Sequence, residues 1–522
     1  MFLHELYFVG EQAMIINLTN PKITKKVLVL AATYLIFSCF QPTHALAENS
    51  SPKLDKRCAE IRNKVDAYLT KISKKRFSGA VLIDYKGKKI LSKGYGDADR
   101  KKGINYTRNT ISDIGSVTKQ FTAAAILKLE MQGKLSTADK LSKYFSDLPQ
   151  DKSNITLHEV LNMSAGLHTY SDTDGDFEAV TNKGFLDIAM NQKLLSKPGS
   201  HWEYSNTSYS LLALLIERVS GMSYETYLYE NLFKPAGMQH TGYSRPQFKG
   251  SNVAVQHQNG LATGKPTEKP WQGDEPYLHL KGNGGILSTI EDLYKWHQAL
   301  LSDEILSAKA KDKYFKPYIE AWGGRTNDSY AYGWFIRNTA RNTQLVHHAG
   351  GNGAAFAYFY RFIDEDITFI IVSNDDDGFN PKIDEQIEGL IFDVNFKPLD
   401  KTGYISLNEL VGEKTNIEKI ISFVKKELSS SSPSGYNLSQ RSINSFGYDF
   451  VRNNLLDDAL KIFKFNVELF PKSPDVYDSY GETLIELGDI KAGLQAYEKA
   501  LALDPSYGNS IYAQETIQKY KN

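Results

Sequence analysis

The sequence predicts an α+β protein in which helices flank an antiparallel β-sheet and interrupt it with an inserted helical region, followed by a small all-α repeat region. Segments with strand character occur early, at 77–94, and again late, at 332–373. Helical patterns fill much of the chain between them. A 34-residue periodicity occupies the end of the chain. Because strands enclose the helices on both sides, we expect early and late strands to meet in one sheet.

The composition is that of a globular protein and argues against some partners. The chain has 522 residues, of which 41% are hydrophobic, so it is long enough for two or more packed domains. Its 61 lysines and arginines balance its 61 aspartates and glutamates. A chain without net charge has no general electrostatic attraction for nucleic acid, and we expect no nucleic-acid partner.

The N-terminus has the features of an export signal. Three lysines precede an apolar run, residues 27–40, which is short for a membrane span. Small residues follow at Ala45 and Ala47, as in a cleavage site. We therefore predict a signal peptide over 1–47 and a mature protein in the bacterial periplasm or outside the cell.

Alternatives remain open for this N-terminus. The apolar run could instead be a membrane anchor, and Cys39 lies in a stretch that loosely resembles a lipoprotein cleavage box. Met14 could be the true start in place of Met1. Removal of a signal would leave Cys58 as the sole cysteine, so we expect no intramolecular disulfide.

The predicted elements run in the order strands, helices, strands. Loops are expected over much of 168–200 and 234–285, which are rich in glycine and polar residues. Predicted strands lie at 77–84, 89–94, 332–336, 345–348, 354–362 and 368–373. Predicted helices lie at 58–71, 116–133, 155–161, 208–220, 224–233, 289–301 and 381–394.

Ser116 and Lys119 stand at the head of the first long apolar helix. A separation of three residues puts both side chains on one helix face, where the lysine amine can reach the serine hydroxyl. A serine needs a base to become a nucleophile, and a lysine can serve only when it is neutral. This spacing is common, and alone it would indicate an ordinary buried helix start.

Two downstream motifs change that interpretation. Tyr204-Ser205-Asn206 and His348-Ala349-Gly350 follow the first motif in the order S-x-x-K, Y-x-N, [KH]-x-G. The ordered set resembles the serine β-lactamase and penicillin-binding DD-peptidase superfamily. Its Y-x-N element resembles the branch with class C β-lactamases, soluble DD-peptidases and related esterases. The resemblance spans residues 55–397, which would form the catalytic domain.

The resemblance implies a catalytic role for several residues. Ser116 would be the acylated nucleophile, Lys119 would help remove its proton, and Tyr204 would be the general base, as a phenolate or in a relay with Lys119. The backbone N–H groups of Ser116 and Gly351 would form the oxyanion hole. No cofactor is implied by the family, and no metal-ligating motif occurs in the sequence.

The resemblance also implies substrate-binding positions. Asn206 would position the substrate amide and the lysine amine, and His348 occupies the place of the class C lysine. Gly350 would leave room for substrate along the strand edge. Because neighbours in a strand point to opposite faces, only one of His347 and His348 can face the cleft, and we predict His348.

The implied activity is that of an exported serine hydrolase acting on peptide, ester or β-lactam acyl groups through an ester on Ser116. A neutral imidazole at His348 would hold a substrate carboxylate less firmly than lysine does. We therefore expect D-alanyl-D-alanine carboxypeptidase-like or esterase-like activity rather than efficient β-lactam hydrolysis. The alternatives are a class C-like β-lactamase and a catalytically inactive penicillin-binding or interaction protein that works through its repeats.

Two other motifs resemble ligand-binding loops, but we predict no binding function for them. The acidic run 375–377 lacks calcium-loop spacing and predicts a solvated turn. Residues 281–285 are glycine-rich but lack the lysine and hydroxyl residue that end a phosphate-binding loop.

The C-terminal part resembles the tetratricopeptide repeat. A linker with one short helix is predicted over 398–435, and Gly447, Phe463 and Pro471 recur 34 residues later within 436–522. Two repeats are fewer than the three usually needed to stand alone. We expect them to pack on the catalytic domain, on the helix predicted at 417–428, or on a protein partner.

Overall fold

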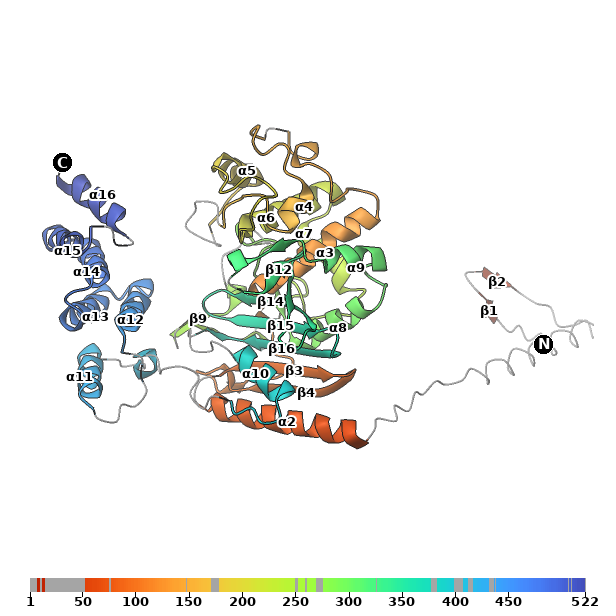
Figure 1. Cartoon of the computed structure of the whole chain (residues 1–522), viewed down its shortest axis with the longest axis horizontal. Helices are drawn as coiled ribbons and strands as arrows, with labels where there is room; N and C mark the ends of the chain where they lie inside the picture. The colour runs from red at the N-terminus through yellow and green to blue at the C-terminus, as the bar shows by residue number, and fades with distance from the viewer. Residues whose placement is uncertain are drawn as a thin grey trace, which may run out of the picture. The chain divides into compact units, whose positions relative to one another are not determined.

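A computed structural model of the chain places these elements in space (Figure 1). Secondary structure occupies most of the described part of the chain. The structure describes residues 7–9, 12–14, 52–74, 77–146, 148–169, 178–248, 252–258, 261–268, 276–324, 326–376, 383–398, 407–411, 416–430, 436, 438–505, 507 and 509–521.

Early and late strands form one antiparallel sheet of eight strands, as predicted, in the order β11-β12-β13-β14-β15-β16-β3-β4. The two ends of the region meet because β16 pairs with β3 from Ile367↔Tyr85 to Ser373↔Gly79. The strands are β3 (Gly79–Tyr85), β4 (Lys88–Tyr95), β11 (Ile319–Glu320), β12 (Asp328–Tyr330), β13 (Phe335–Asn338), β14 (Gln344–Gly351), β15 (Phe356–Phe362) and β16 (Ile367–Ser373).

One face of the sheet is covered by two helices far apart in sequence, α2 (Pro52–Ser73) and α10 (Ile383–Phe392) (Figure 1). On α2, Ile61, Val65 and Leu69 recur every four residues, and all three are fully buried. They share one apolar cluster with side chains of β3, β15, β16 and α10. Burial of each such side chain stabilises the fold by roughly 1.5–3 kcal/mol.

Helix α3 (Thr118–Met131) is the centre of the helical layer on the other face. Every residue from Thr118 to Leu127 is buried, polar side chains included. Around it are α4 (Leu157–Leu161), α5 (Asn182–Asn191), α6 (Asn206–Ser220), α7 (Tyr224–Leu228), a π-helical turn η3 (Tyr229–Phe233), α8 (Ile290–Leu301) and α9 (Ala308–Tyr314). This layer is the predicted inserted helical region, since it lies between β4 and β11 in the chain.

Helix α6 begins two residues earlier than predicted because its cap lies upstream. The Ser205 hydroxyl accepts a hydrogen bond from the Ser208 backbone N–H (3.0 Å), which satisfies one of the free donors of the first turn. The helix ends at Gly221, whose φ is 72°. The early start makes Asn206 the first residue of α6 and brings its side chain toward α3.

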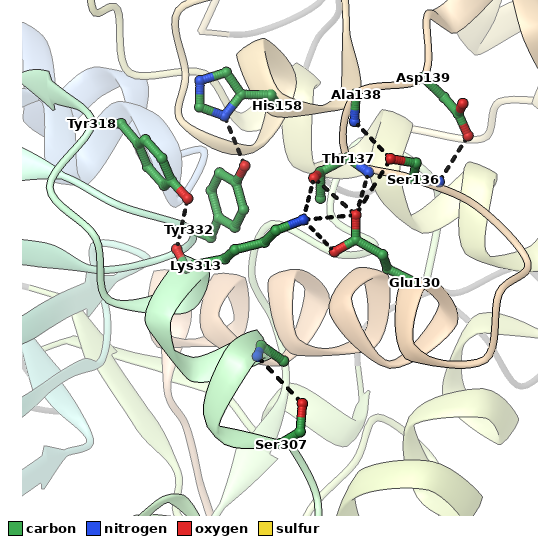
Figure 2. Close-up of polar contacts among 11 residues, drawn as sticks. Glu130, Ser136, Thr137, Ala138, Asp139, His158, Ser307, Lys313, Tyr318 and Tyr332 are labelled. Atoms are coloured by element: carbon green, nitrogen blue, oxygen red, sulfur yellow. Dashed lines mark hydrogen bonds and ion pairs between the residues drawn. The ribbon is translucent and has the colours of Figure 1, made fainter.

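A polar cluster fastens α9 to the C-terminal end of α3 (Figure 2). The Lys313 amine donates to both carboxylate oxygens of Glu130 (2.9 and 2.8 Å) and to the Thr137 hydroxyl (3.2 Å). Glu130 also accepts hydrogen bonds from the Thr137 backbone and side chain. Burial opposes ionisation of Glu130, but these donors outweigh it and lower the pKa of the carboxyl.

Three smaller ladders are described in the same region of the chain, two of them two-stranded: β5 (Asp97–Asp99) with β6 (Ile104–Asn105), and β7 (Ser112–Asp113) with β10 (Leu287–Ser288). The third joins β17 (Asp375–Asp376), β8 (Gln256–Gln258) and β9 (Leu261–Gly264). The prediction of a solvated turn at 375–376 is therefore wrong: Asp375 is only 2% exposed and forms an ion pair with Arg100. An ion pair with a residue far away in sequence leaves no local signal.

The C-terminal region is helical, as predicted. It contains η7 (Leu407–Leu410), α11 (Ile417–Leu428), α12 (Gln440–Arg452), α13 (Leu456–Leu469), α14 (Pro474–Glu486), α15 (Ile490–Leu503) and α16 (Ser510–Lys521). Gly447 packs against the ring of Phe463, and Gly481 packs against Ala496 and Tyr497. The same contact thus recurs at the predicted spacing, and the assignment to the tetratricopeptide family stays a prediction.

Helix α11 belongs to this helical body rather than to a linker, which corrects part of the interpretation of 398–435. Ile417, Ile420 and Val424 are buried in one apolar cluster with side chains of α12 and α13. The expectation that the repeats pack on this helix is confirmed. Most of the predicted serine-rich linker, 431–435, lies outside the described residues.

Little of the predicted export signal is described. Within 1–47 the structure describes only β1 (Tyr7–Val9) and β2 (Gln12–Met14), which pair with each other, and the apolar run 27–40 lies outside the described residues. Among the helices that the structure describes, none is both long and apolar enough to cross a membrane.

Candidate active site

Ser116 lies in a 3₁₀ turn, η1 (Gly115–Val117), that leads directly into α3. Such a turn brings residues three apart onto the same side, so Ser116 in the turn faces Lys119, the second residue of α3, as predicted. Two side chains hold the turn. The Asp113 carboxylate accepts hydrogen bonds from the Gly115 N–H (2.7 Å) and from the Asn352 side-chain amide (2.9 Å).

Lys119 is fully buried and directed at three acceptors. Its amine donates to the Ser116 hydroxyl (3.0 Å), to the Asn206 side-chain oxygen (2.7 Å) and to the Asn283 carbonyl (2.7 Å). Three predicted site residues from α6 and the start of α3 are thereby brought together. The Asn283 carbonyl was missed, because a backbone oxygen in an irregular loop leaves no sequence signal.

Tyr204 lies just before α6, and its half-buried ring lines the same cavity as Ser116. The Lys119 amine lies 4.9 Å from the centre of this ring. The ring plane is 11° from that of Trp322, with centroids 6.2 Å apart. The lysine amine thus faces the hydroxyl of Ser116 and the ring of the predicted base together.

Strand β14 and the serine turn approach each other through two glycines. A Cβ on Gly350 would lie 2.1 Å from the Ile114 carbonyl and 2.7 Å from the Ser116 nitrogen. On the opposite side, Gly115 has φ 51° and faces the Gly351 nitrogen at 2.4 Å from its Cβ position. The missing side chain of Gly350 therefore makes room for the serine turn, and the room for substrate along the strand edge stays a prediction.

The two predicted oxyanion-hole nitrogens, those of Ser116 and Gly351, therefore lie on either side of the point where β14 meets the serine turn. The strand edge beside them is also available. Pairing of β13 with β14 ends at Phe335↔His347, so within the described sheet the edge of His348–Gly351 on that side has no partner strand. An extended substrate could pair there, as expected from the motif.

His347 and His348 point to opposite faces of β14, as predicted, and His348 is the one that lines the cavity. The His347 ring packs on the other side with Nε2 3.0 Å from Asp328. For His348, Nδ1 donates to the Ala349 carbonyl (2.6 Å), so Nε2 is left to accept from the Tyr330 hydroxyl (3.3 Å).

The His348 imidazole is neutral at pH 7. Burial, helped by the positive charge of Lys119, lowers its pKa to about 3. The position therefore provides no cation for a substrate carboxylate.

The cavity measures about 450 Å³ and contains a set of residues that sequence reasoning missed. Trp322 is the most exposed of them at 42%, and its φ of 58° is unusual for a residue with a side chain. A glycine pair follows it and was the only local signal. Among the described residues, those that line the cavity are Ser116, Tyr204, Trp322, Phe335, His348, Ala349, Gly350, Gly351, Phe356, Tyr358 and Asp376.

A metal centre has no candidate in the described residues: they contain no group of three His, Cys, Asp or Glu side chains that could hold an ion. The described polar groups that converge on Ser116 are instead an amine, a phenol, an amide and backbone N–H groups. This set suits acyl transfer to a serine.

Comparison with known proteins identifies the family. The Beta-lactamase family model matches residues 61–390. Penicillin-binding protein 4* of Bacillus subtilis is 30% identical over 348 residues, which cover 63% of this chain and 76% of that protein. The match covers 66% of the protein PbpX of Bacillus subtilis and 63% of the protein flp of Staphylococcus aureus.

Solved structures agree at the level of the fold. The octameric penicillin-binding protein homologue from Pyrococcus abyssi has a TM-score of 0.55 and 25% identity, and the match covers 67% of this chain and 80% of that one. A β-lactamase/D-alanine carboxypeptidase from Pseudomonas syringae has a TM-score of 0.53 with 16% identity, covering 65% and 99%.

Proposed function

The chain belongs to the β-lactamase/penicillin-binding protein superfamily, and we propose that it is an exported serine hydrolase that forms an acyl-enzyme on Ser116. One observation carries the proposal: the buried Lys119 amine joins the Ser116 hydroxyl to Asn206, a residue from a distant segment. An ordinary buried helix start would not need a lysine with no exposure beside an exposed cavity.

The proton of Ser116 passes to Tyr204 in this proposal. The Lys119 amine donates to the Ser116 hydroxyl, the Asn206 side-chain oxygen and the Asn283 carbonyl, and in this proposal it is an ammonium. An ammonium cannot itself take a proton, but it stabilises a neighbouring phenolate and passes protons between the two hydroxyls. Tyr204 is therefore the base, and Lys119 is the relay.

The reaction then has two matched steps. The Ser116 oxygen attacks the acyl carbon, the N–H groups of Ser116 and Gly351 bind the oxyanion, and the leaving group departs with the proton held by Tyr204. Water then attacks the serine ester and gives a proton to the same base; the bond between the acyl carbon and the Ser116 oxygen breaks, the base returns the proton to that oxygen, and the acid is released.

Ester bonds are favoured as substrates over β-lactams. A β-lactam carries a carboxylate, as a D-alanyl-D-alanine peptide also does, and the neutral His348 provides no charge to hold it. The activity would be of the D-alanyl-D-alanine carboxypeptidase or esterase type, with weak β-lactam turnover. A class C-like β-lactamase is the second candidate, supported by the Y-x-N motif.

A substrate panel tests the proposal. Purified protein is assayed with p-nitrophenyl esters, D-alanyl-D-alanine peptides and nitrocefin, with Ser116→Ala and Tyr204→Phe as matched controls. We expect turnover of esters or peptides that is lost in both variants. Faster turnover of nitrocefin than of every ester and peptide would favour the β-lactamase, and no turnover of any substrate would favour an inactive interaction protein.

Export and a protein partner are two further parts of the proposal. Cleavage after Ala47 predicts that the mature chain begins at Glu48, and N-terminal sequencing of the secreted or periplasmic protein tests this. The repeats at 436–522 would bind a protein of the cell envelope. An unchanged set of captured envelope proteins after deletion of 436–522 would contradict that role.

A further inference from the structure

One end of the cavity holds a carboxylate among aromatic rings. Asp376 lines the cavity together with Phe356 and Tyr358 of β15. A Cβ on Gly351 would lie 3.5 Å from the Asp376 carboxylate oxygen, so this acid sits beside the nitrogen assigned to the oxyanion hole.

The short strand β17 sets the direction of this side chain. Asp375 and Asp376 pair in register with His257 and Gln258 of β8. Neighbours in a strand point to opposite sides. Asp375 is buried and is the partner of Arg100, whereas Asp376 is half-buried and reaches the cavity.

The described charge in the cavity lining is negative. Of the lining residues that the structure describes, Asp376 carries a formal negative charge at neutral pH, Tyr204 carries one when it serves as the base, and His348 is neutral. Lys119 is buried behind the serine and donates to its three acceptors. Burial, with Asp384 and Asp376 nearby, raises the pKa of Tyr358, so its phenol stays protonated.

Aromatic faces strengthen the preference of such a site for cations. Rings of Tyr204, Trp322, Phe335 and Tyr358 line the cavity, and a ring face attracts an ammonium. A substrate carboxylate at this end would instead meet Asp376 and be repelled.

We propose that Asp376 selects acyl groups that carry an ammonium one or two carbons from the reacting carbonyl. The inference rests on the proposed acyl-enzyme at Ser116 and narrows its substrate class. The short separation follows from the position of Asp376 beside Gly351, because the oxyanion of the same acyl group binds at the Gly351 nitrogen.

Two isosteric esters test the proposal: p-nitrophenyl 3-aminopropanoate, which is an ammonium at pH 7, and p-nitrophenyl butanoate, which carries a methyl in its place. The measured quantity is the ratio of their kcat/KM values, divided by the ratio of their spontaneous hydrolysis rates. We expect a ratio of about ten or more for the wild type, because a charge-assisted hydrogen bond forms with one ester alone.

Asp376→Asn should lower this ratio severalfold, because the amide keeps the shape and removes the charge, and only the weaker attraction of the aromatic faces is left. Asp312→Asn, at an exposed position of α9, removes one negative charge elsewhere and should keep the wild-type ratio. A wild-type ratio near one, or a ratio that survives in Asp376→Asn, overturns the inference. Should that variant not fold, the wild-type ratio decides alone.

The same assay separates this inference from the function on which it rests. Hydrolysis of neither ester above the Ser116→Ala background would overturn both. Ser116-dependent hydrolysis of both esters without preference for the ammonium would overturn the role of Asp376 and leave the serine hydrolase in place.

Discussion

Gly350→Ala should uncouple the nucleophile from its oxyanion hole. The added Cβ would lie 2.1 Å from the Ile114 carbonyl and 2.7 Å from the Ser116 nitrogen, both backbone atoms. No side chain can turn away, so β14 and the serine turn must separate by roughly 1 Å. A displacement of that size costs about 100-fold in rate, and loss of one oxyanion donor costs roughly 100–1,000-fold. We expect acylation to slow by about 100-fold or more.

The neighbouring glycine provides a matched control. A Cβ on Gly351 would meet Asp376 at 3.5 Å and the Ala355 carbonyl at 3.7 Å, which are ordinary contacts. Gly351→Ala adds the same methyl one residue further along the strand and should slow acylation by about tenfold at most.

The assay is the second-order rate of covalent labelling by a fluorescent fluorophosphonate, with thermal unfolding to verify that each variant is folded. Wild-type labelling rates in Gly350→Ala would refute the reasoning. An equal loss in both glycine variants would refute it too, because the two positions differ in what their methyl groups meet.

Three further predictions concern the buried polar groups. Lys119→Met should abolish labelling and lower the free energy of unfolding by roughly 1–3 kcal/mol, since it leaves buried acceptors such as the Asn283 carbonyl unpaired; normal labelling would exclude the relay. The pKa of His348 in the folded protein, about 3, lies below its unfolded value of about 6.5, so its contribution to stability is complete above pH 6.5 and lost as pH falls toward 3. His348→Gln should therefore flatten the fall in urea stability between pH 7 and pH 5, and an unchanged slope would contradict the neutral imidazole. Lys313→Met should lower the free energy of unfolding in urea by roughly 1–2 kcal/mol, because it removes the donor to Glu130. The labelling rate of the folded variant should stay within about twofold of wild type. Unchanged stability would show that the polar cluster of Lys313 and Glu130 does not stabilise the fold.

Much of the site was predictable because three motifs in a fixed order along the chain indicated which residues would meet. Ser116, Lys119, Tyr204, Asn206 and His348 come from three distant segments, and the structure brings these segments together around one cavity. The pattern of early strands, helices and late strands predicted that early and late strands share one sheet, since the early strands alone would leave one edge unpaired.

The remaining residues depend on contacts that a sequence does not record. Asp376 belongs to an acidic run whose sequence suggests exposure to solvent. The pairing of β17 with β8 and the ion pair of Asp375 with Arg100 turn Asp375 inward and leave Asp376 at the cavity. The Asn283 carbonyl reaches Lys119 through the path of an irregular loop. Trp322 reaches the cavity through a strained backbone position.

The central claim is that Ser116 becomes covalently acylated. Peptide mass spectrometry after exposure to a fluorescent penicillin or fluorophosphonate tests it most directly. The account predicts one adduct, on the peptide that contains Ser116, and none in Ser116→Ala. An adduct on another residue, or an unlabelled wild-type protein that is fully folded, would contradict it.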